Sequence, residues 1–427
     1  MQHPAYYTWI VFAGVMAVSW WAFAGDPSPD LMATWLAGYF FEQGAVYPGS
    51  EGVFTMQPPD AWIAELDAAG HEGVVYPYVY PPLWAALASR VVGVLPFPLV
   101  EIVATLVNPL LLCGMVWLAA RTARDSDVSV PLMTLAGSLL LLATLPGAAA
   151  LEQNQPQIIV SFLVVAAIER SRAGAPVTAG LALAVAAAIK VSPALLVVAW
   201  LGAGRYRESL VFAIAGLCLA LASVLLAGWP MHAAFLAELD AIRNTVLATF
   251  FTYGVDPVVA GLVPAGESQF ILGRGGETAW HVVEKPAVWS MLSTLAMVTI
   301  LAVAAVRFHA ASRDGREPDV LGYPVFLVAV TLVSPLAWGY HYLAPMAFLP
   351  HLLAVFGLRT GLLALLAVLI PLTPQSFDLV RSLPVVSQMP AALGTATMIL
   401  VGLLLHLAGR RRAGRPSGHL QRPPVSL

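Results

Sequence analysis

The sequence predicts an all-α, multi-pass membrane protein, and three observations lead to this fold class. Of its 427 residues, 59% are hydrophobic and 11% are charged, whereas a soluble globular chain carries about 25% charged residues. The mean hydropathy of +0.80 also excludes a disordered chain, because disorder requires low hydrophobicity and high net charge. Apolar stretches recur along the whole sequence, so the chain is not a soluble domain on a membrane anchor.

About twelve apolar segments approach the length of a membrane-spanning helix, which needs roughly 20 residues. They lie near residues 6–25, 98–120, 129–148, 155–169, 177–189, 191–203, 208–228, 287–307, 320–334, 342–358, 359–373 and 389–408. The segment 80–96 is also apolar but contains Arg90, so it is either another span or a helix that does not cross. We therefore expect one integral-membrane domain over residues 1–408 and a disordered, basic cytoplasmic tail over 409–427.

The charged residues predict the orientation of the chain. Residues 26–89 contain acidic side chains but no Lys or Arg, which places them on the outer side of the membrane. Arginines recur between the later apolar segments and in the tail, and all of these groups fall on the inner side if 80–96 does not cross. We therefore favour twelve crossings with both termini in the cytoplasm.

Two expected outer loops, 26–97 and 228–286, are too long to be simple connectors, and long loops in a compact fold are usually functional. In the first loop, apolar residues spaced by three and four follow Asp30 and again follow Asp60. This spacing predicts two amphipathic helices that lie on the membrane surface. The outer loops are therefore the expected place for a functional site.

Polar groups beside apolar segments are functional candidates, because ionisable side chains are costly there. Lys190, one of only two lysines in the chain, stands at the join of two predicted spans. It is expected either to bind a lipid phosphate or to reach the membrane surface along its alkyl stem. A second polar group is expected either to bind an anion at a helix N-terminus or only to cap that helix. Its members are Glu152, Gln153, Asn154, Gln155 and Gln157.

Aromatic residues form two further groups. Trp338 and Tyr340 can stack on a sugar face and His341 can donate to a phosphate, although an interfacial aromatic belt would also explain the first two. The segment from Tyr76 to Pro82, which includes Tyr80, is stiffened by its prolines. It is expected either to contact a ligand or to hold the acidic loop against the membrane.

The acidic loop supplies two candidate bases, Asp26 and Asp30, which directly follow the first predicted span. Either carboxylate can deprotonate an acceptor hydroxyl, or it can cap the helix that follows. The sequence contains no paired metal-ligand motif, no phosphate-binding glycine loop and no basic patch suited to nucleic acid. We therefore predict no metal, no cofactor and no nucleic-acid partner.

Taken together, these motifs resemble glycosyltransferase family 87, a branch of the C-type glycosyltransferases that use sugars carried on polyprenol phosphate. The resemblance covers roughly residues 6–408. The matching elements are Asp30 with Trp35, Gly38, Gly44 and Tyr47; Tyr78-Val79-Tyr80-Pro81-Pro82-Leu83; Lys190-Val191-Ser192-Pro193; and Ser334-Pro335 with Trp338 and His341. Two positions depart from the family pattern. The family has Gly-Gln-x-Asn where this chain has Asn154-Gln155-Pro156-Gln157, and its usual histidine position falls on Tyr340, so either Tyr340 or His341 can fill it.

The resemblance implies a bundle of about twelve transmembrane helices in the plasma membrane and an active site on the periplasmic or extracellular face. It implies transfer of a sugar, with mannose favoured, from a polyprenyl-phosphate donor to a hydroxyl of a lipid-linked or glycan acceptor, with inversion. Asp30 is the implied base and Asp26 the reserve. The implied ligands of the donor phosphate are Lys190, His341 and Gln155. The implied substrate-binding residues are Tyr80, Trp338, Tyr340, Asn154 and Gln157.

Two other functions remain open from the sequence alone. Twelve spans also suit a transporter or flippase of lipid-linked substrates, although such proteins tend to have internal repeats and polar groups near the membrane midplane. A scaffold without catalytic activity is the third hypothesis. A transporter would move substrate without sugar transfer, and a scaffold would tolerate loss of Asp30.

Overall fold

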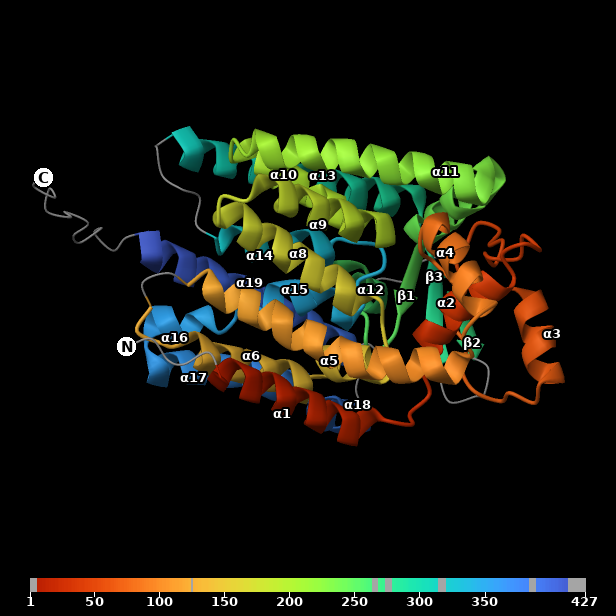
Figure 1. The fold of residues 1–427 in the computed structure, drawn as a ribbon, viewed down its shortest axis with the longest axis horizontal. Coiled ribbons are helices and arrows are strands. Elements are labelled where there is room, and N and C mark those ends of the chain that lie inside the picture. The colour runs from red at the N-terminus through yellow and green to blue at the C-terminus, as the bar shows by residue number, and fades with distance from the viewer. Residues whose placement is uncertain are drawn as a thin grey trace, which may run out of the picture.

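The computed structural model describes residues 6–123, 126–262, 268–272, 279–313, 320–383 and 389–413. Most of these residues form helices that run roughly along the long axis of the molecule (Figure 1). The helices of this bundle are α1 (Tyr6–Phe23), α5 (Phe97–Arg121), α6 (Val130–Ala143), α7 (Leu145–Glu152), α8 (Gln157–Arg172), α9 (Pro176–Ile189), α10 (Leu196–Gly202), α11 (Tyr206–Arg243), α13 (Ala287–Arg313), α14 (Gly322–Leu332), α15 (Leu343–Met346), α16 (His351–Phe356), α17 (Leu358–Leu369) and α19 (Met389–Ala413).

A smaller layer covers the end of the bundle that lies away from the two chain termini, and we call it the end layer (Figure 1). Its elements are α2 (Pro29–Tyr39), α3 (Asp60–Ala68), α4 (Pro82–Val92), β1 (Thr245–Ala248), β2 (Ser268–Leu272) and β3 (Ala279–Glu284). Two further helices, α12 (Val255–Leu262) and α18 (Pro374–Ser382), pack against α19. Short 3-10 turns are η1 (Ser192–Leu195), η2 (Gly339–Tyr342) and η3 (Ile370–Leu372).

The predicted apolar segments are helical at the expected places, but their lengths differ. Five described helices, α1, α5, α11, α13 and α19, are long and apolar enough to cross a membrane. The total reaches seven if two bent pairs, α6 with α7 (75°) and α17 with α18 (50°), each count as one span. Among the shorter helices, α9 and α10 are separated by extended backbone at Lys190. The prediction of twelve crossings is therefore not confirmed.

Helix α4 lies within residues 80–96, the segment that is either another span or a helix that does not cross the membrane. It has 11 residues, so at about 1.5 Å per residue it is roughly half as long as the hydrocarbon core is thick. It packs against α2 in the end layer and against α11. The expectation that residues 80–96 do not cross the membrane stays a prediction.

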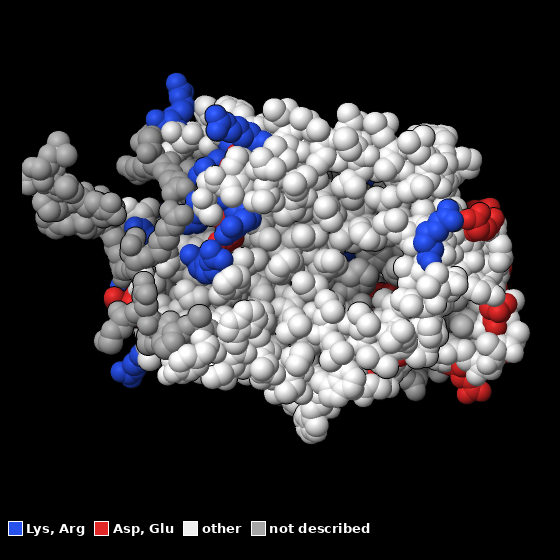
Figure 2. Space-filling model, viewed as in Figure 1, with Lys and Arg blue, Asp and Glu red and all other residues white. Residues whose placement is uncertain are grey.

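The charges separate along the bundle axis. In the view of Figure 2, most Lys and Arg side chains lie near the end that carries the chain termini, and Asp and Glu side chains lie mainly around the end layer. Between these ends the visible surface carries almost no charge. Membrane proteins commonly separate their charges in this way, and we call the end that carries the chain termini the basic end.

The two segments predicted as outer loops pack against each other in the end layer. The backbone N–H of Phe54 donates to Thr245 Oγ1 at 2.9 Å, and the indole of Trp280 donates to the carbonyl of Thr55 at 3.1 Å. The predicted helices after Asp30 and Asp60 are present as α2 and α3. The expectation of an all-α fold is wrong in one detail, because β1, β3 and β2 form an antiparallel sheet in that order.

Helix α11 also corrects the boundary of the second predicted loop. The helix continues past Gly228 to Arg243, with a kink at Gly228, whose φ of 73° and ψ of 160° favour glycine. At the other end of the chain, α19 continues to Ala413, into the segment 409–427 that we expect to be a tail. Residues 414–427 lie outside the described part of the chain.

Three hydrophobic clusters of the described residues hold these parts together, and one of them joins Phe54 to Leu247 and Trp280. The bundle core contains large, fully buried side chains such as Trp200, Tyr342 and Phe348. A separate core in the end layer includes Trp62 and Tyr78. Burying such side chains stabilises the fold by about 1.5–3 kcal/mol each relative to leaving them exposed.

Candidate active site

Asp30 is held in the first turn of α2, at the inner side of the end layer. Helix α2 packs so closely on α4 that a Cβ atom at Gly38 would lie 2.6 Å from the carbonyl carbon of Ala88. Helix α4 in turn reaches the end of α9, because the indole N–H of Trp84 donates to the carbonyl of Ala188 at 2.9 Å. The sequence of contacts from α2 through α4 to α9 brings the segment of Asp30 towards that of Lys190.

Asp30 does not cap its helix. Ser28 occupies the N-cap position and makes no side-chain capping bond, whereas Asp30 lies within the first turn. The Asp30 side chain is buried, and its Oδ2 atom makes no hydrogen bond within the described part of the chain. A buried carboxylate oxygen without a partner is unusual and calls for a functional explanation.

Lys190 and His341 meet although 151 positions separate them in the sequence. Lys190 follows the last residue of α9, and His341 lies in η2, between α14 and α15. Lys190 Nζ is 2.5 Å from His341 Nε2, and it lies 5.7 Å and 5.9 Å from the ring centroids of Tyr80 and Tyr340. The ammonium thus points into an aromatic chamber rather than along its stem to the membrane surface.

Gln155 and Gln157, from the polar group at the start of α8, have different hydrogen-bond partners. Gln155 Oε1 accepts a hydrogen bond of 2.6 Å from the Tyr80 hydroxyl, and the Gln155 side chain is buried. Gln157 Nε2 donates to Ser161 Oγ at 3.1 Å, one helical turn further on. The Nε2 atom of Gln155 and the Oε1 atom of Gln157 are buried without a partner in the described part of the chain.

Asn154 has a different environment. Its Nδ2 group donates to Ser28 Oγ at 2.8 Å and to Thr105 Oγ1 at 3.0 Å, and its Oδ1 atom accepts from Asn108 at 2.9 Å. These bonds join α5 and the segment before α2 to the start of α8. Because its amide is used in this way, Asn154 is better described as a positioning residue than as a substrate ligand.

A cavity of about 280 Å³ lies among these groups, between the end layer and the bundle. The expected site residues that line it are Asp30, Tyr80, Gln157, Lys190, Trp338, Tyr340 and His341. Asp26, Asn154 and Gln155 do not line it. The opposite wall is apolar and includes Val160, Val164, Leu195, Leu327 and Val330. The cavity is therefore lined by both polar and apolar side chains.

Burial raises the pKa of Asp30 to about 7, while the positive charge of Lys190 and the nearby amide of Gln155 oppose the rise. Burial also raises the pKa of Tyr76, which lines the same cavity, and the negative charges of Asp30 and Glu152 add to that effect. A carboxyl group with a pKa close to neutral is suited to accept a proton at physiological pH.

Some lining residues escaped the sequence analysis. Ser161, Met56 and Met297 line the cavity from α8, from the segment before α3 and from α13. Ser161 follows Gln157 by four residues, so the 3.6-residue period of α8 could have placed both on one face. Met56 and Met297 carry no comparable signal, because only the packing of distant segments brings them to the site.

The structure also bears on the choice between Tyr340 and His341. Both side chains line the cavity, but the His341 imidazole contacts the Lys190 ammonium directly. The Tyr340 ring packs against Phe251 and Trp338. This geometry favours His341 as the partner of an anion that binds at Lys190. Within the described residues, no cluster of three His, Cys, Asp or Glu side chains is arranged to hold a metal ion.

The sequence model of glycosyltransferase family 87 matches residues 78–335. This range contains Tyr80 and Lys190 but ends before His341 and begins after Asp30. Among solved structures, the chain is similar to the crystal structure of ArnT from Cupriavidus metallidurans bound to undecaprenyl phosphate. That similarity has 14% sequence identity and a TM-score of 0.34, over 96% of this chain and 78% of that chain. No curated protein matches the sequence.

Proposed function

The chain belongs to glycosyltransferase family 87, and on that premise we propose that it transfers a sugar from a polyprenyl-phosphate donor to a hydroxyl group of a lipid-linked or glycan acceptor. The observation that carries this proposal is the cavity that Asp30, with its unpartnered Oδ2 atom, lines together with the Lys190–His341 pair. The cavity offers a base, a cation and an apolar wall, and the proposed reaction uses all three.

The donor phosphate binds at Lys190 and His341 in this proposal. The ammonium and the imidazole are 2.5 Å apart, so both can contact one phosphate group, and charge-assisted hydrogen bonds of this kind are the strong ones. The isoprenoid chain then follows the apolar wall that Val160, Val164 and Leu327 line. Gln155 supports the phosphate site indirectly, because it fixes Tyr80 beside the ammonium.

Asp30 acts as the base of an inverting displacement. The acceptor oxygen attacks the anomeric carbon from the face opposite the phosphate, and its proton passes to the Asp30 carboxylate. The bond between the anomeric carbon and the phosphate oxygen breaks with its electron pair, and Lys190 stabilises the charge of the departing polyprenyl phosphate. Asp26 does not line the cavity, so Asp30 is the preferred base.

The sugar lies among Tyr80, Trp338 and Tyr340, whose rings can pack on its apolar face. Gln157, with a buried and unpartnered Oε1 atom, can accept a hydrogen bond from a sugar hydroxyl. The favoured sugar is mannose. The separation of basic and acidic ends supports a cytoplasmic basic end, and the cavity beneath the end layer then faces the periplasm or the cell exterior.

The test uses Asp30→Asn, with Asp26→Asn as a matched control. Purified protein is given synthetic polyprenyl-phosphate-mannose and a membrane extract as acceptor, and sugar transfer is followed with radiolabelled mannose. We expect Asp30→Asn to lower kcat roughly 10²- to 10⁴-fold, since this is the usual contribution of a positioned base. Asp26→Asn should retain transfer within about threefold, because its side chain lies outside the cavity.

The alternatives predict other results. Equal transfer by both variants and the intact protein would remove Asp30 as the base. Loss of transfer in Asp26→Asn alone would assign the role to Asp26. Uptake of the lipid-linked substrate into proteoliposomes without any transfer of sugar to the extract would favour a transporter.

A further inference from the structure

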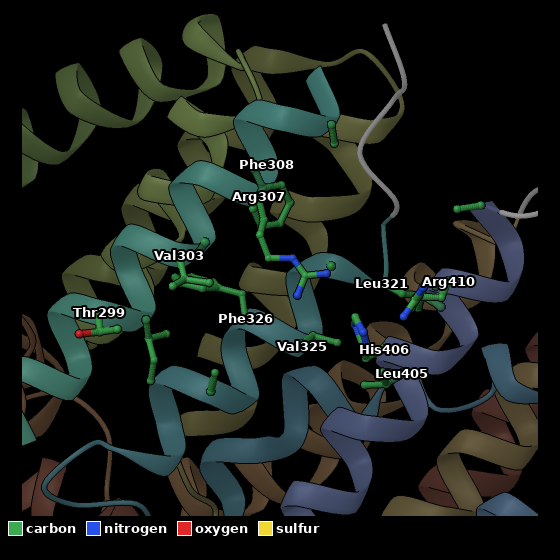
Figure 3. A pocket seen from close by; sticks show the side chains of 17 residues that line it. Thr299, Val303, Arg307, Phe308, Leu321, Val325, Phe326, Leu405, His406 and Arg410 are labelled. Carbon is green, nitrogen blue, oxygen red and sulfur yellow. The ribbon is translucent and has the colours of Figure 1, made fainter. Parts of the chain in front are cut away.

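A second cavity lies between α13, α14 and α19, towards the basic end of the bundle (Figure 3). Its volume is about 420 Å³, and none of the residues that line it line the cavity around Asp30. Val325 and Phe326 of α14 line it together with Leu321, which directly precedes that helix, and most of the other lining residues come from α13 and α19. Nothing in the proposed reaction uses this space.

The ionisable side chains that line this cavity are all basic. Arg307 extends from α13 into the space between the helices, and His406 and Arg410 face it from α19 (Figure 3). No Asp or Glu side chain is among the lining residues. Within the described part of the chain, neither arginine makes a hydrogen bond or an ion pair. The cavity therefore presents two guanidinium groups that are free to bind an anion.

The remaining walls are apolar and open towards the membrane. Val303 lies on the rim and is 51% exposed, and the exposed part of α13 continues through Val306. Small residues, including Ala311 and Gly409, leave room between the helices. Cationic groups at one end and a hydrocarbon surface beside them complement the anionic head group and the acyl chain of a phospholipid.

We propose that this cavity binds a glycerophospholipid with an anionic head group, taken from the membrane leaflet at the basic end. The phosphate contacts Arg307 and Arg410, with His406 as a further donor, and an acyl chain follows Val303 along α13. Basic pockets between transmembrane helices are known to recognise anionic head groups. A free phosphate ion would use the arginines but would gain nothing from the apolar walls.

A lipid in this second cavity would contact helices that also line the cavity around Asp30. Helices α13 and α14 also line the catalytic cavity, through Met297 and through Leu327 and Val330. A lipid between α13 and α19 would hold these helices together at their other ends. We therefore expect the bound lipid to raise the thermal stability of the whole bundle.

The experiment titrates delipidated, full-length protein in detergent, with binding followed by native mass spectrometry and by thermal unfolding. The probes are phosphatidylglycerol, phosphatidylcholine with the same acyl chains, inorganic phosphate and polyprenyl phosphate. We expect phosphatidylglycerol to bind at least tenfold more tightly than phosphatidylcholine and to raise Tm, while inorganic phosphate at the same concentration leaves Tm unchanged.

Two variants locate the site. Arg307→Gln combined with Arg410→Gln should weaken phosphatidylglycerol binding about 10- to 30-fold, because each arginine near an anionic head group contributes about 1 kcal/mol. Arg313→Gln combined with Arg359→Gln is the control, since it removes the same charge from exposed arginines that do not line the cavity. Val303→Trp should weaken binding while both arginines remain, because the indole fills the path of the acyl chain.

Several outcomes would overturn the proposal. They are equal affinity for the two phospholipids, the same loss of binding in the control variant, and full binding by Val303→Trp. Stabilisation by inorganic phosphate alone would show a simple anion site. Displacement of phosphatidylglycerol by an equal concentration of polyprenyl phosphate would assign the cavity to the isoprenoid substrate or product.

Discussion

The chain has two lysines, and both lie near a buried aspartate, but their surroundings differ. Lys285 forms an ion pair with Asp256 Oδ2, and the other carboxylate oxygen accepts from the Trp289 indole at 2.9 Å and from Ser293 at 3.3 Å. Every polar atom of that carboxylate has a partner. At the candidate active site, Asp30 Oδ2 has none in the described part of the chain.

The comparison separates a closed ion pair from a lysine and an aspartate that line one cavity without forming an ion pair among the described residues. The Lys285–Asp256 pair is closed, with side chains 1% and 5% exposed, and it joins α12 to the start of α13. Lys190 instead contacts a neutral ring and faces a cavity. A carboxylate and an ammonium that bind each other have few polar atoms left for a ligand. A carboxylate oxygen without a partner can instead accept a proton, and a cation that lines a cavity can bind a phosphate group.

The largest effects on stability and on sugar transfer should come from two separate variants, each of which removes one lysine ammonium group. Lys285→Met leaves the Asp256 carboxylate buried and uncompensated, which should destabilise the protein by about 3–5 kcal/mol. Lys190→Met should lower kcat/KM roughly 10²- to 10³-fold by removing a donor to the leaving phosphate, with little change in stability. Thermal unfolding and sugar transfer, measured on both variants, check the two statements. Equal loss of stability in both variants would contradict the distinction between the two lysines.

The pH dependence of transfer should follow Asp30. Burial raises its pKa to about 7, so the carboxylate becomes protonated and transfer falls as the pH drops below about 7. The decline should approach tenfold per pH unit for kcat/KM, and the residual activity of Asp30→Asn should lack it. A wild-type profile that stays flat between pH 5 and 8 would exclude Asp30 as the titrating base.

The raised pKa of Asp30 also makes the stability of the protein depend on pH. The pKa of Asp30 is higher in the folded protein than its ordinary value of 3.8, so folding favours the protonated form. The stability that this group contributes is present at low pH and is lost as the pH rises from about 4 to about 7. Asp30→Asn should therefore be more stable than the wild type at pH 8 and about equally stable at pH 4, as thermal unfolding at the two values would reveal.

The smallest expected effect comes from one hydrogen bond in each region. Trp289→Phe removes a donor to Asp256 and should cost about 1–3 kcal/mol of stability without changing transfer. Tyr80→Phe breaks the hydrogen bond to Gln155 and should raise KM for the donor severalfold, because Tyr80 lies beside the Lys190 ammonium. A lower kcat in Trp289→Phe would contradict this prediction, because it would show that the Lys285–Asp256 pair also affects sugar transfer.

Much of the helical structure could be predicted, because apolar composition is a local property of the chain. The predicted segments at 98–120 and 177–189 correspond closely to α5 and α9. The number of crossings could not be predicted in the same way, since a break such as the extended backbone at Lys190 divides a segment without changing its hydropathy. The sheet was missed because β1 pairs with β3 through contacts between distant positions such as Thr245 and Glu284.

The sequence by itself determined the membrane environment, the helical character and the residue types of the site. These follow from composition and from short motifs, which depend on neighbouring residues alone. Only the tertiary structure decided how Lys190 differs from Lys285 and how Gln157 differs from Asn154. Whether a buried polar atom finds a partner depends on which distant segments pack around it. Composition and short motifs describe only neighbouring residues, so they do not predict these contacts.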